Sequence, residues 1–255
     1  MVEPEPSQNI ESIRKTNLVL KGLKELNGAG VSELADHMDM PKTTVHAHLT
    51  TLHSCELVSK VENKYQIGLR FVGLGEFAKN QFDLYSIAKD EVDMLAEESQ
   101  DMAQFVIEEH GLGVYLYKAE PPRAVRTTAG VGDRRPLHCT GIGKSILSCF
   151  PDTHINEIID RRGLPAKTEN TITDFDKLMD ELEDIREQGY AVDNEEIEPG
   201  LRCVAAPVDP DDKSAVGAIS ISGPTGRLKD ARLDNSLIEM VTDAANIIEI
   251  NARNV

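Results

Sequence analysis

The chain has 255 residues, of which 44 are acidic and 27 are basic, so its formal net charge is −17. This length suggests one or two domains, and a hydrophobic share of 40% is enough for a buried core, which excludes a wholly disordered chain. No stretch approaches the roughly 18 uncharged apolar residues of a membrane span, and the first residues lack an apolar signal core. The excess of acid argues at first sight against a partner as acidic as DNA.

The charge is unevenly distributed along the chain. Residues 1–68 carry seven basic and nine acidic side chains, a net charge of −2, whereas the remainder carries 20 and 35, a net charge of −15. Between Met40 and Cys55 there is no acid at all. We therefore expect the two parts of the chain to face different partners.

The four cysteines, Cys55, Cys139, Cys149 and Cys203, form no CxxC pair. In a chain of this length they are typical of reduced, mostly buried thiols. Together with the lack of a membrane span, they predict a cytoplasmic protein.

Residues 1–69 have the pattern of three helices followed by a hairpin. The helices are expected over 12–27, after Ser32, and from Pro41, whose missing N–H is tolerated in a first helical turn. Two strand-like runs, 57–60 and 65–67, then predict a hairpin. This order is that of a winged helix-turn-helix domain.

The third predicted helix leaves a polar, acid-free surface outward. Such a helix can enter the major groove of DNA, while basic and hydroxyl side chains hold the phosphates. The candidate DNA contacts are Lys42, Thr43, Thr44, His46 and His48 on this helix, with Lys60 and Lys64 on the hairpin, or wing. A small helical domain with an ordinary solvated face is the alternative interpretation.

A cluster of His46, His48, His53 and Cys55 suggests a metal site. However, positions 46 and 48 point to different sides of a helix, and no matching cluster lies elsewhere in the sequence. We therefore predict no metal and interpret these histidines as phosphate-facing or internally hydrogen-bonded.

Residues 70–83 predict a linker helix interrupted by Gly73 and Gly75. The GxGxxA match within it follows no clear parallel strand, which argues against a dinucleotide site. Residues 84–255 then predict a second domain. Its expected helices cover 84–100, 140–150, 152–161, 174–188 and 230–250, and its expected strands cover 105–107, 114–117, 124–128, 201–208 and 215–222. Strands with intervening helices but no regular alternation predict an α+β domain on an antiparallel sheet.

The run from Gly141 to Ser145 ends like a phosphate-binding Walker A loop. The first glycine of that motif would fall at His138, so the phosphate cradle is incomplete and we predict no nucleotide cofactor. A glycine-rich entry into a helix near Thr140 can still bind a small anion such as a carboxylate through backbone N–H groups. A tight turn required only for packing explains the glycines equally well.

Catalysis has little support in the sequence. His138, Cys139 and Asp193 could form a nucleophile with partners, but no local catalytic motif surrounds them. The acidic run containing Asp193, Glu195 and Glu196 is expected to be solvated. Cys203, in an apolar run, is interpreted as a buried small side chain rather than a reactive thiol. We predict that the protein is not an enzyme.

Several segments resemble the isocitrate-lyase-regulator (IclR) family of transcription factors when they are taken together and in order. They are MPKTTVHAHLTTL at 40–52, KYQIGLR at 64–70, PLHCTGIGKSIL at 136–147, YAVDNEE with PGLRCVAAPV across 190–208, and AISISGP at 218–224. The resemblance implies an N-terminal winged helix, a linker helix and a C-terminal GAF/PAS-like effector domain, which together form a homodimer or a dimer of dimers.

The resemblance also implies a small-molecule pocket. Family effector contacts map to Gly141, Ile142, Asp193, Cys203, Ser220 and Ser222. Family members often carry alanine where this chain has Ile142, so its pocket is expected to be narrower or to favour a more apolar ligand. In the recognition helix, His46-Ala47-His48 stands where arginine is frequent, so the operator is expected to differ.

These observations predict a ligand-responsive, DNA-binding regulator of the catabolism of a sugar, a sugar acid or an aromatic acid. The alternatives are a small-molecule enzyme and a ligand sensor that acts through a protein partner. The net charge of −15 on the residues after 68 is interpreted as an adaptation to a high-salt cytoplasm, as in a haloarchaeon. Molar salt would screen the repulsion between this acidic part of the chain and DNA.

Overall fold

The computed structural model describes residues 10–122, 124, 129–209, 216–228 and 236–253. The chain divides into two compact units, Met1–Lys79 and Asn80–Val255. Most of the strand expected over 124–128 lies outside the described residues. Among the helices that are described, none is both long enough and apolar enough to cross a membrane.

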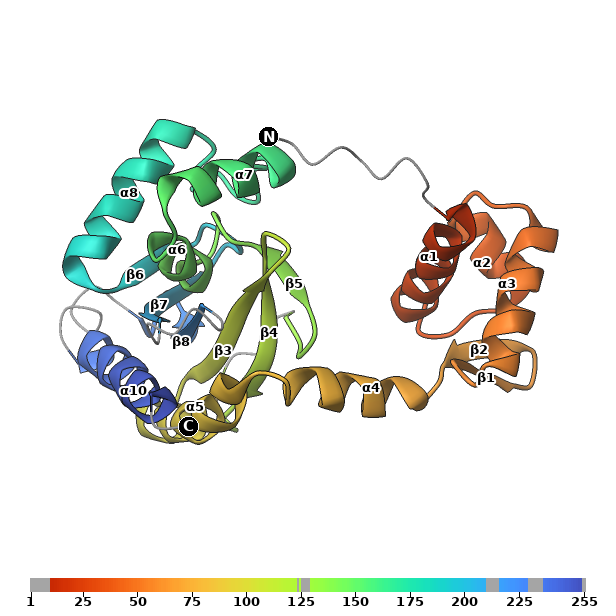
Figure 1. Cartoon of the computed structure of the whole chain (residues 1–255), viewed down its shortest axis with the longest axis horizontal. Coiled ribbons are helices and arrows are strands. Elements are labelled where there is room, and N and C mark those ends of the chain that lie inside the picture. Colours follow the sequence, from red (N-terminus) through yellow and green to blue (C-terminus); the bar gives the residue numbers. More distant parts are fainter. Residues whose placement is uncertain (1–9, 123, 125–128, 210–215, 229–235, 254–255) are drawn as a thin grey trace. The chain divides into compact units, whose positions relative to one another are not determined.

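The N-terminal unit contains the three helices and the hairpin that the sequence predicts (Figure 1). The helices are α1 (Glu11–Glu25), α2 (Val31–His37) and α3 (Lys42–Ser54), and the wing is formed by β1 (Val58–Val61) and β2 (Lys64–Ile67), an antiparallel pair. The predicted stripe of α3, Val45, Leu49 and Leu52, is buried against Val19 and Leu23 of α1 in a single apolar core. Because Val45, Leu49 and Leu52 pack into this core, the opposite face of α3 points to solvent.

The linker region differs from its prediction. Helix α4 covers Arg70–Lys79 and continues through Gly73 and Gly75 without interruption. A Cβ added at either glycine would meet no described atom within 4 Å, so glycine at these positions serves no close approach to the described part of the chain. Helix α5 begins at Asp83 and runs to Ser99.

The C-terminal unit is built on a six-stranded antiparallel sheet in the order β5-β4-β3-β8-β7-β6. Its strands are β3 (Met102–Glu109), β4 (Leu112–Ala119), β5 (Arg134–Pro136), β6 (Ala191–Asn194), β7 (Leu201–Val208) and β8 (Gly217–Pro224). The two short edge strands, β5 and β6, were missed by the sequence analysis. The predicted α+β class with an antiparallel sheet is confirmed.

Helices cover both faces of this sheet (Figure 1). On one face lie α5 and α10 (Ser236–Ala252), and on the other lie α6 (Gly141–Ser148), α7 (Asp152–Arg162) and α8 (Phe175–Gln188). Strand β7 shows the alternation clearly, because Val204 and Ala206 face α5 and α10 while Cys203 and Ala205 face α6. The predicted pocket residues of β7 and β8 therefore lie beneath α6.

Candidate functional site

The polar surface of α3 is largely exposed. Lys42, Thr43 and His46 are exposed and Thr44 is half-buried, whereas Val45 and Leu49 between them are in the core. The first turn of α3 contains no acid. A solvated helix N-terminus with a lysine and hydroxyl groups suits contacts with phosphates and base edges.

His48 differs from the other candidate DNA contacts. Its ring Nδ1 lies 2.9 Å from the Thr16 hydroxyl of α1, and the residue is half-buried. This hydrogen bond joins α3 to α1 within the unit. His48 is therefore internally hydrogen-bonded, which is one of the two interpretations that the sequence left open for these histidines.

The two wing lysines are exposed but have neighbours. Lys60 Nζ lies 5.2 Å from the ring centroid of Tyr65, and Lys64 Nζ lies 3.8 Å from a carboxylate oxygen of Glu33. Both contacts are at the surface, where such interactions are weak and can be exchanged for a phosphate. In the described part of the chain, no group of three or more His, Cys, Asp or Glu side chains is arranged to hold a metal ion.

A small cavity with a volume of about 30 Å³, partly open to solvent, lies in the C-terminal unit beneath α6. Four of the six predicted effector contacts line it: Ile142, Asp193, Cys203 and Ser222. The other two are adjacent. A Cβ added to Gly141 would contact the backbone N of Asp193 at 3.1 Å, and the Ser220 hydroxyl lies beside the Cys203 thiol. The structure thus brings all six residues together from α6, β6, β7 and β8.

The N-terminus of α6 is fixed by local backbone geometry. Thr140 caps the helix, since its hydroxyl accepts a hydrogen bond of 3.0 Å from the Gly143 N–H. A Cβ at Gly143 would collide with the Leu137 backbone, so only glycine allows this close turn. The N–H of Ile142 is directed at the Cys203 thiol. The cap and the glycines place the positive end of the helix at the cavity.

Asp193 is buried, which corrects the expectation that the acidic run is solvated. It lies on β6, is only 1% exposed, and accepts a hydrogen bond of 2.7 Å from the Glu196 N–H. Burial, with the nearby Glu196 carboxylate, raises the pKa of Asp193 to about 7. Near neutral pH this group can therefore either donate or accept a hydrogen bond.

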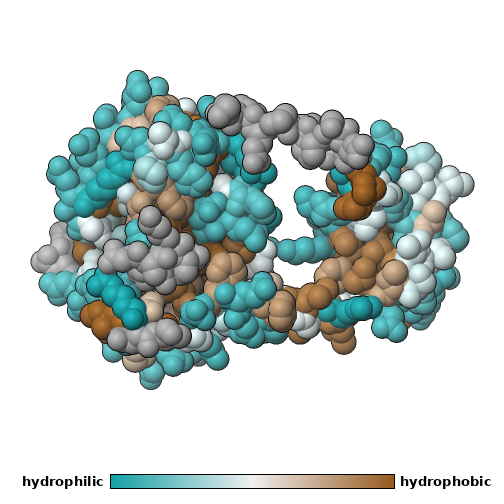
Figure 2. All heavy atoms as spheres, in the orientation of Figure 1, coloured by the Kyte–Doolittle hydropathy of each residue, from teal (hydrophilic) through white to brown (hydrophobic). Residues whose placement is uncertain are grey.

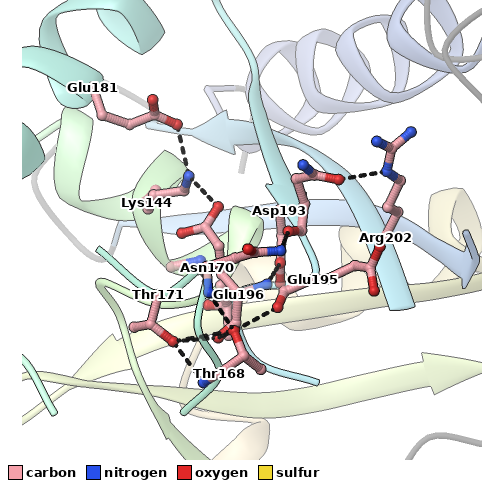
Figure 3. Close-up of polar contacts among 12 residues, drawn as sticks. Lys144, Thr168, Asn170, Thr171, Glu181, Asp193, Glu195, Glu196 and Arg202 are labelled. Carbon is pink, nitrogen blue, oxygen red and sulfur yellow. Dashed lines mark hydrogen bonds and ion pairs between the residues drawn. The ribbon is translucent and has the colours of Figure 1, made fainter. Parts of the chain in front are cut away.

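Lys144 follows the α6 N-terminus and is 1% exposed. Its Nζ lies 2.6 Å from a Glu181 oxygen of α8 and 2.7 Å from a Glu196 oxygen, as Figure 3 shows. Although burial alone would lower the pKa of Lys144, the two carboxylates raise it, so the ammonium stays charged. A lysine committed to these partners is not available to a nucleotide, in agreement with the incomplete Walker motif.

The connection between β6 and β7, residues 195–200, forms part of the cavity wall through Ile197 and Glu198. Hydroxyl groups hold its backbone, because Thr168 Oγ1 donates to the Glu195 carbonyl and Thr171 Oγ1 donates to the Glu196 carbonyl, each at 2.7 Å (Figure 3). This wall and Lys144 were not foreseen, since their partners lie far away in the sequence.

His138, Cys139 and Cys203 are each in surroundings that do not favour catalysis. The His138 ring lies 3.2 Å from the Pro165 carbonyl, and burial lowers its pKa. Burial raises the pKa of Cys139 and that of Cys203 to about 12, which keeps both as neutral thiols. Cys203 is buried, as the sequence predicts.

A winged helix and a separate α+β unit with an internal cavity define a class of protein, the ligand-binding transcriptional regulators. The IclR helix-turn-helix domain matches residues 12–62, and the C-terminal domain of the bacterial transcriptional regulator IclR matches residues 77–250. The chain therefore belongs to the IclR family and is a DNA-binding transcriptional regulator.

Individual relatives agree with this assignment. The transcriptional regulator ArcR of Halobacterium salinarum is 31% identical over 98% of both chains. The crystal structure of Thermotoga maritima IclR superimposes with a TM-score of 0.78 at 27% identity, covering 96% of this chain and 100% of that one. An IclR homologue from Microbacterium hydrocarbonoxydans, crystallised with 4-hydroxybenzoate, has the same fold, with a TM-score of 0.78 at 20% identity over 96% of this chain and 100% of its own.

Proposed function

We propose that this regulator responds to a small organic acid, from the catabolism of a sugar, sugar acid or aromatic compound, that binds in the cavity beneath α6. The observation that carries the proposal is the convergence of Ile142, Asp193, Cys203 and Ser222 on one cavity at a helix N-terminus. The 4-hydroxybenzoate complex of the Microbacterium homologue supports an acid as the ligand class. Cys139 and Cys203 are neutral thiols, and Lys144 is paired with Glu181 and Glu196. Both observations support a binding role rather than an enzymatic one.

Each predicted contact has a suitable chemical role. The backbone N–H of Gly141, and that of Ile142 in exchange for its contact with the Cys203 thiol, would receive the carboxylate at the positive end of α6. Asp193, which can carry a proton near pH 7, would donate to or accept from the ligand. The Ser220 and Ser222 hydroxyls and the Cys203 thiol would complete the floor.

The DNA-binding role falls to the domain at 1–69. Lys42, Thr43, Thr44 and His46 of α3 would contact the major groove, and Lys60 and Lys64 of the wing would hold phosphates. His48 would act mainly by fixing α3 to α1 through Thr16. The rest of the chain is divided into a linker over residues 70–83 and an effector domain over residues 84–255.

A homodimer, or a dimer of dimers, is the expected assembly. Helix α4 buries none of its described side chains, and Val72, Leu74 and Phe77 are all more than half exposed. Figure 2 shows hydrophobic surface, in brown, along the segment that Figure 1 labels α4. Apolar surface of this kind is normally covered by a partner. Two copies would present two α3 helices to two operator half-sites, and an effector that favours one arrangement would change DNA affinity.

We also propose that the protein works in a high-salt cytoplasm. The charge of −17 and the relative from Halobacterium salinarum support this proposal. Screening by salt at about 1 M shortens the Debye length to about 3 Å, so the acidic C-terminal unit would not repel DNA.

A thermal-shift screen of sugar acids and aromatic acids tests the effector site. Wild type is compared with Asp193→Ala and with Asp176→Ala, which removes an exposed acid from α8. We expect at least one acid to raise the melting temperature of wild type and of the α8 control but not of Asp193→Ala. Equal stabilisation of all three proteins by every active acid would refute the site.

A further inference from the structure

Strand β4 carries two tyrosines whose side chains lie on opposite faces of the sheet. Residues two apart in a regular strand share a face, but the pairing of β3 with β4 shifts in register between Phe105 and Val106. This β-bulge leaves Leu116 and Tyr117 packed on the side of α5 and α10, whereas Tyr115 packs on the side of α6. The bulge therefore directs Tyr115 toward the cavity, which its side chain lines.

The Tyr115 hydroxyl has no hydrogen-bond partner within the described part of the chain. The residue is only 6% exposed, so it is not a surface tyrosine whose hydroxyl is hydrated by bulk water. Burial raises the pKa of Tyr115 well above its usual range, so the hydroxyl keeps its proton at neutral pH and remains a donor. A buried donor without a partner is costly, and at a ligand cavity the missing acceptor is supplied by the ligand.

Gln104 of the adjacent strand β3 lines the same cavity and is only 4% exposed. Its Oε1 accepts a long hydrogen bond of 3.5 Å from the Ser222 hydroxyl, and its amide nitrogen donates to no group in the described chain. The Ser222 hydroxyl lies beside the Cys203 thiol, at which the N–H of Ile142 is directed. The Gln104 amide is thus joined to the α6 N-terminus through two neighbouring side chains, which is within the reach of a short ligand.

The size of the cavity makes these two donors decisive. A volume of about 30 Å³ admits a ligand with little apolar area, so hydrogen bonds rather than apolar contacts must distinguish one ligand from another. The proposed function places the effector's carboxylate at the N-terminus of α6. A plain alkyl acid bound there would leave the donors of Tyr115 and Gln104 unpaired, and sites with unpaired buried donors discriminate strongly against such ligands.

We infer that Tyr115 and Gln104 select the effector by donating hydrogen bonds to a hydroxyl or carbonyl oxygen of a short acid whose carboxylate lies at the α6 N-terminus. The assignment rests on the proposed effector cavity and narrows its ligand class to acids that carry a further oxygen. Neither residue is among the six effector contacts that the family resemblance implies.

Strand β4 offers a matched control for the test. The Tyr117 hydroxyl lies 3.0 Å from an Asp93 carboxylate oxygen of α5, on the face of the sheet opposite the cavity. Tyr115→Phe and Tyr117→Phe thus remove the same hydroxyl from the same strand, but only the first removes it from the cavity. Without ligand, Tyr115→Phe should melt no lower than wild type, because it loses no hydrogen bond within the chain.

The experiment is calorimetric titration of the full chain with small acids that differ by one oxygen, acetate with glycolate, and propionate with lactate and pyruvate. For at least one of these comparisons, we expect wild type and Tyr117→Phe to bind the oxygen-bearing acid at least about tenfold more tightly than the plain acid. Tyr115→Phe and Gln104→Met should each reduce this ratio at least about threefold and leave the affinity for the plain acid unchanged.

Several results would overturn the assignment. Wild type could bind plain and oxygen-bearing acids equally, or bind none of these acids, and the preference could survive undiminished in either Tyr115→Phe or Gln104→Met. A lower melting temperature of unliganded Tyr115→Phe would also overturn it, since the hydroxyl would then have a structural partner. If these acids, or those of the thermal-shift screen, bind without such a preference and Asp193→Ala abolishes their binding, the proposed function stands while the role of Tyr115 and Gln104 falls.

Discussion

The polar side chains of α3 and those beneath α6 are in contrasting environments. Lys42, Thr43 and His46 are exposed, so water solvates them until a partner arrives, whereas Lys144 and Asp193 are buried and already have hydrogen-bond partners. Exposed charges cost little to hold and contribute little to stability. Buried charges contribute strongly in either direction, according to whether their partners are present. Substitution of these buried side chains should therefore change stability, and substitution of the exposed α3 side chains should change binding alone.

The largest effect is expected from Lys144→Met. This change leaves the Glu196 carboxylate buried without its cation, and loss of one partner of a buried pair costs about 3–5 kcal/mol. Chemical denaturation of the C-terminal unit measures the loss. Glu181→Gln is the control, because Glu181 is 35% exposed and its removal leaves Lys144 paired with Glu196. A similar loss in both variants would contradict the importance we give to the buried half of the network.

A pH-dependent effect is expected from Asp193→Asn. The pKa of Asp193 is raised from its usual 3.8 to about 7 in the folded protein, so the folded state holds this proton more tightly than the unfolded chain. The free energy of unfolding should therefore fall as pH rises from about 4 to about 7, by at most about 1.4 kcal/mol per pH unit from this group. Its charged or titratable neighbours are Glu196, Lys144, Cys203, Tyr115 and Cys139.

Denaturation of wild type and Asp193→Asn at a series of pH values isolates the contribution of Asp193. The difference between the two curves should slope across this window and become level above it. A difference that is independent of pH would show that Asp193 is ionised throughout, as an exposed aspartate would be.

The same contrast explains what the sequence could predict. The helices and hairpin of the N-terminal unit follow from local periodicity, and the α3 stripe of Val45, Leu49 and Leu52 lies in the core as expected. The family resemblance named six candidate effector contacts, of which four line one cavity in the structure. The edge strands β5 and β6, with three and four residues, are too short and too polar to give a periodic signal.

The residues whose surroundings the sequence did not settle share one physical reason. Glu196 was expected to be solvated, but it binds Lys144, which lies 52 residues earlier in the chain. For His48 the sequence left open a phosphate-facing and an internally hydrogen-bonded side chain, and only the fold shows its contact with Thr16, which lies 32 residues earlier. A charged or polar side chain carries no local sign of a distant partner. Only the folded chain shows whether water or protein solvates it.

The smallest effect on stability, and the one most specific to DNA, is expected from Lys42→Ala and Lys60→Ala. Neither change should alter the unfolding free energy by more than about 0.5 kcal/mol, because both side chains are exposed. Each should weaken binding to DNA from upstream of the protein's own gene. Each should also reduce the slope of log affinity against log salt by about 1, the amount expected for one lost phosphate contact.

Lys177→Ala is the matched control for these two variants, because it removes the same charge from an exposed site on α8 of the C-terminal unit. If α3 and the wing contact the phosphates, the control keeps the wild-type slope in gel-shift titrations over a range of salt. If the net charge of the whole chain governs binding instead, all three variants lose affinity equally. The C-terminal unit carries most of the acidic residues. The second outcome would therefore mean that the net charge of the whole chain, and not the lack of acidic residues on α3, determines DNA affinity.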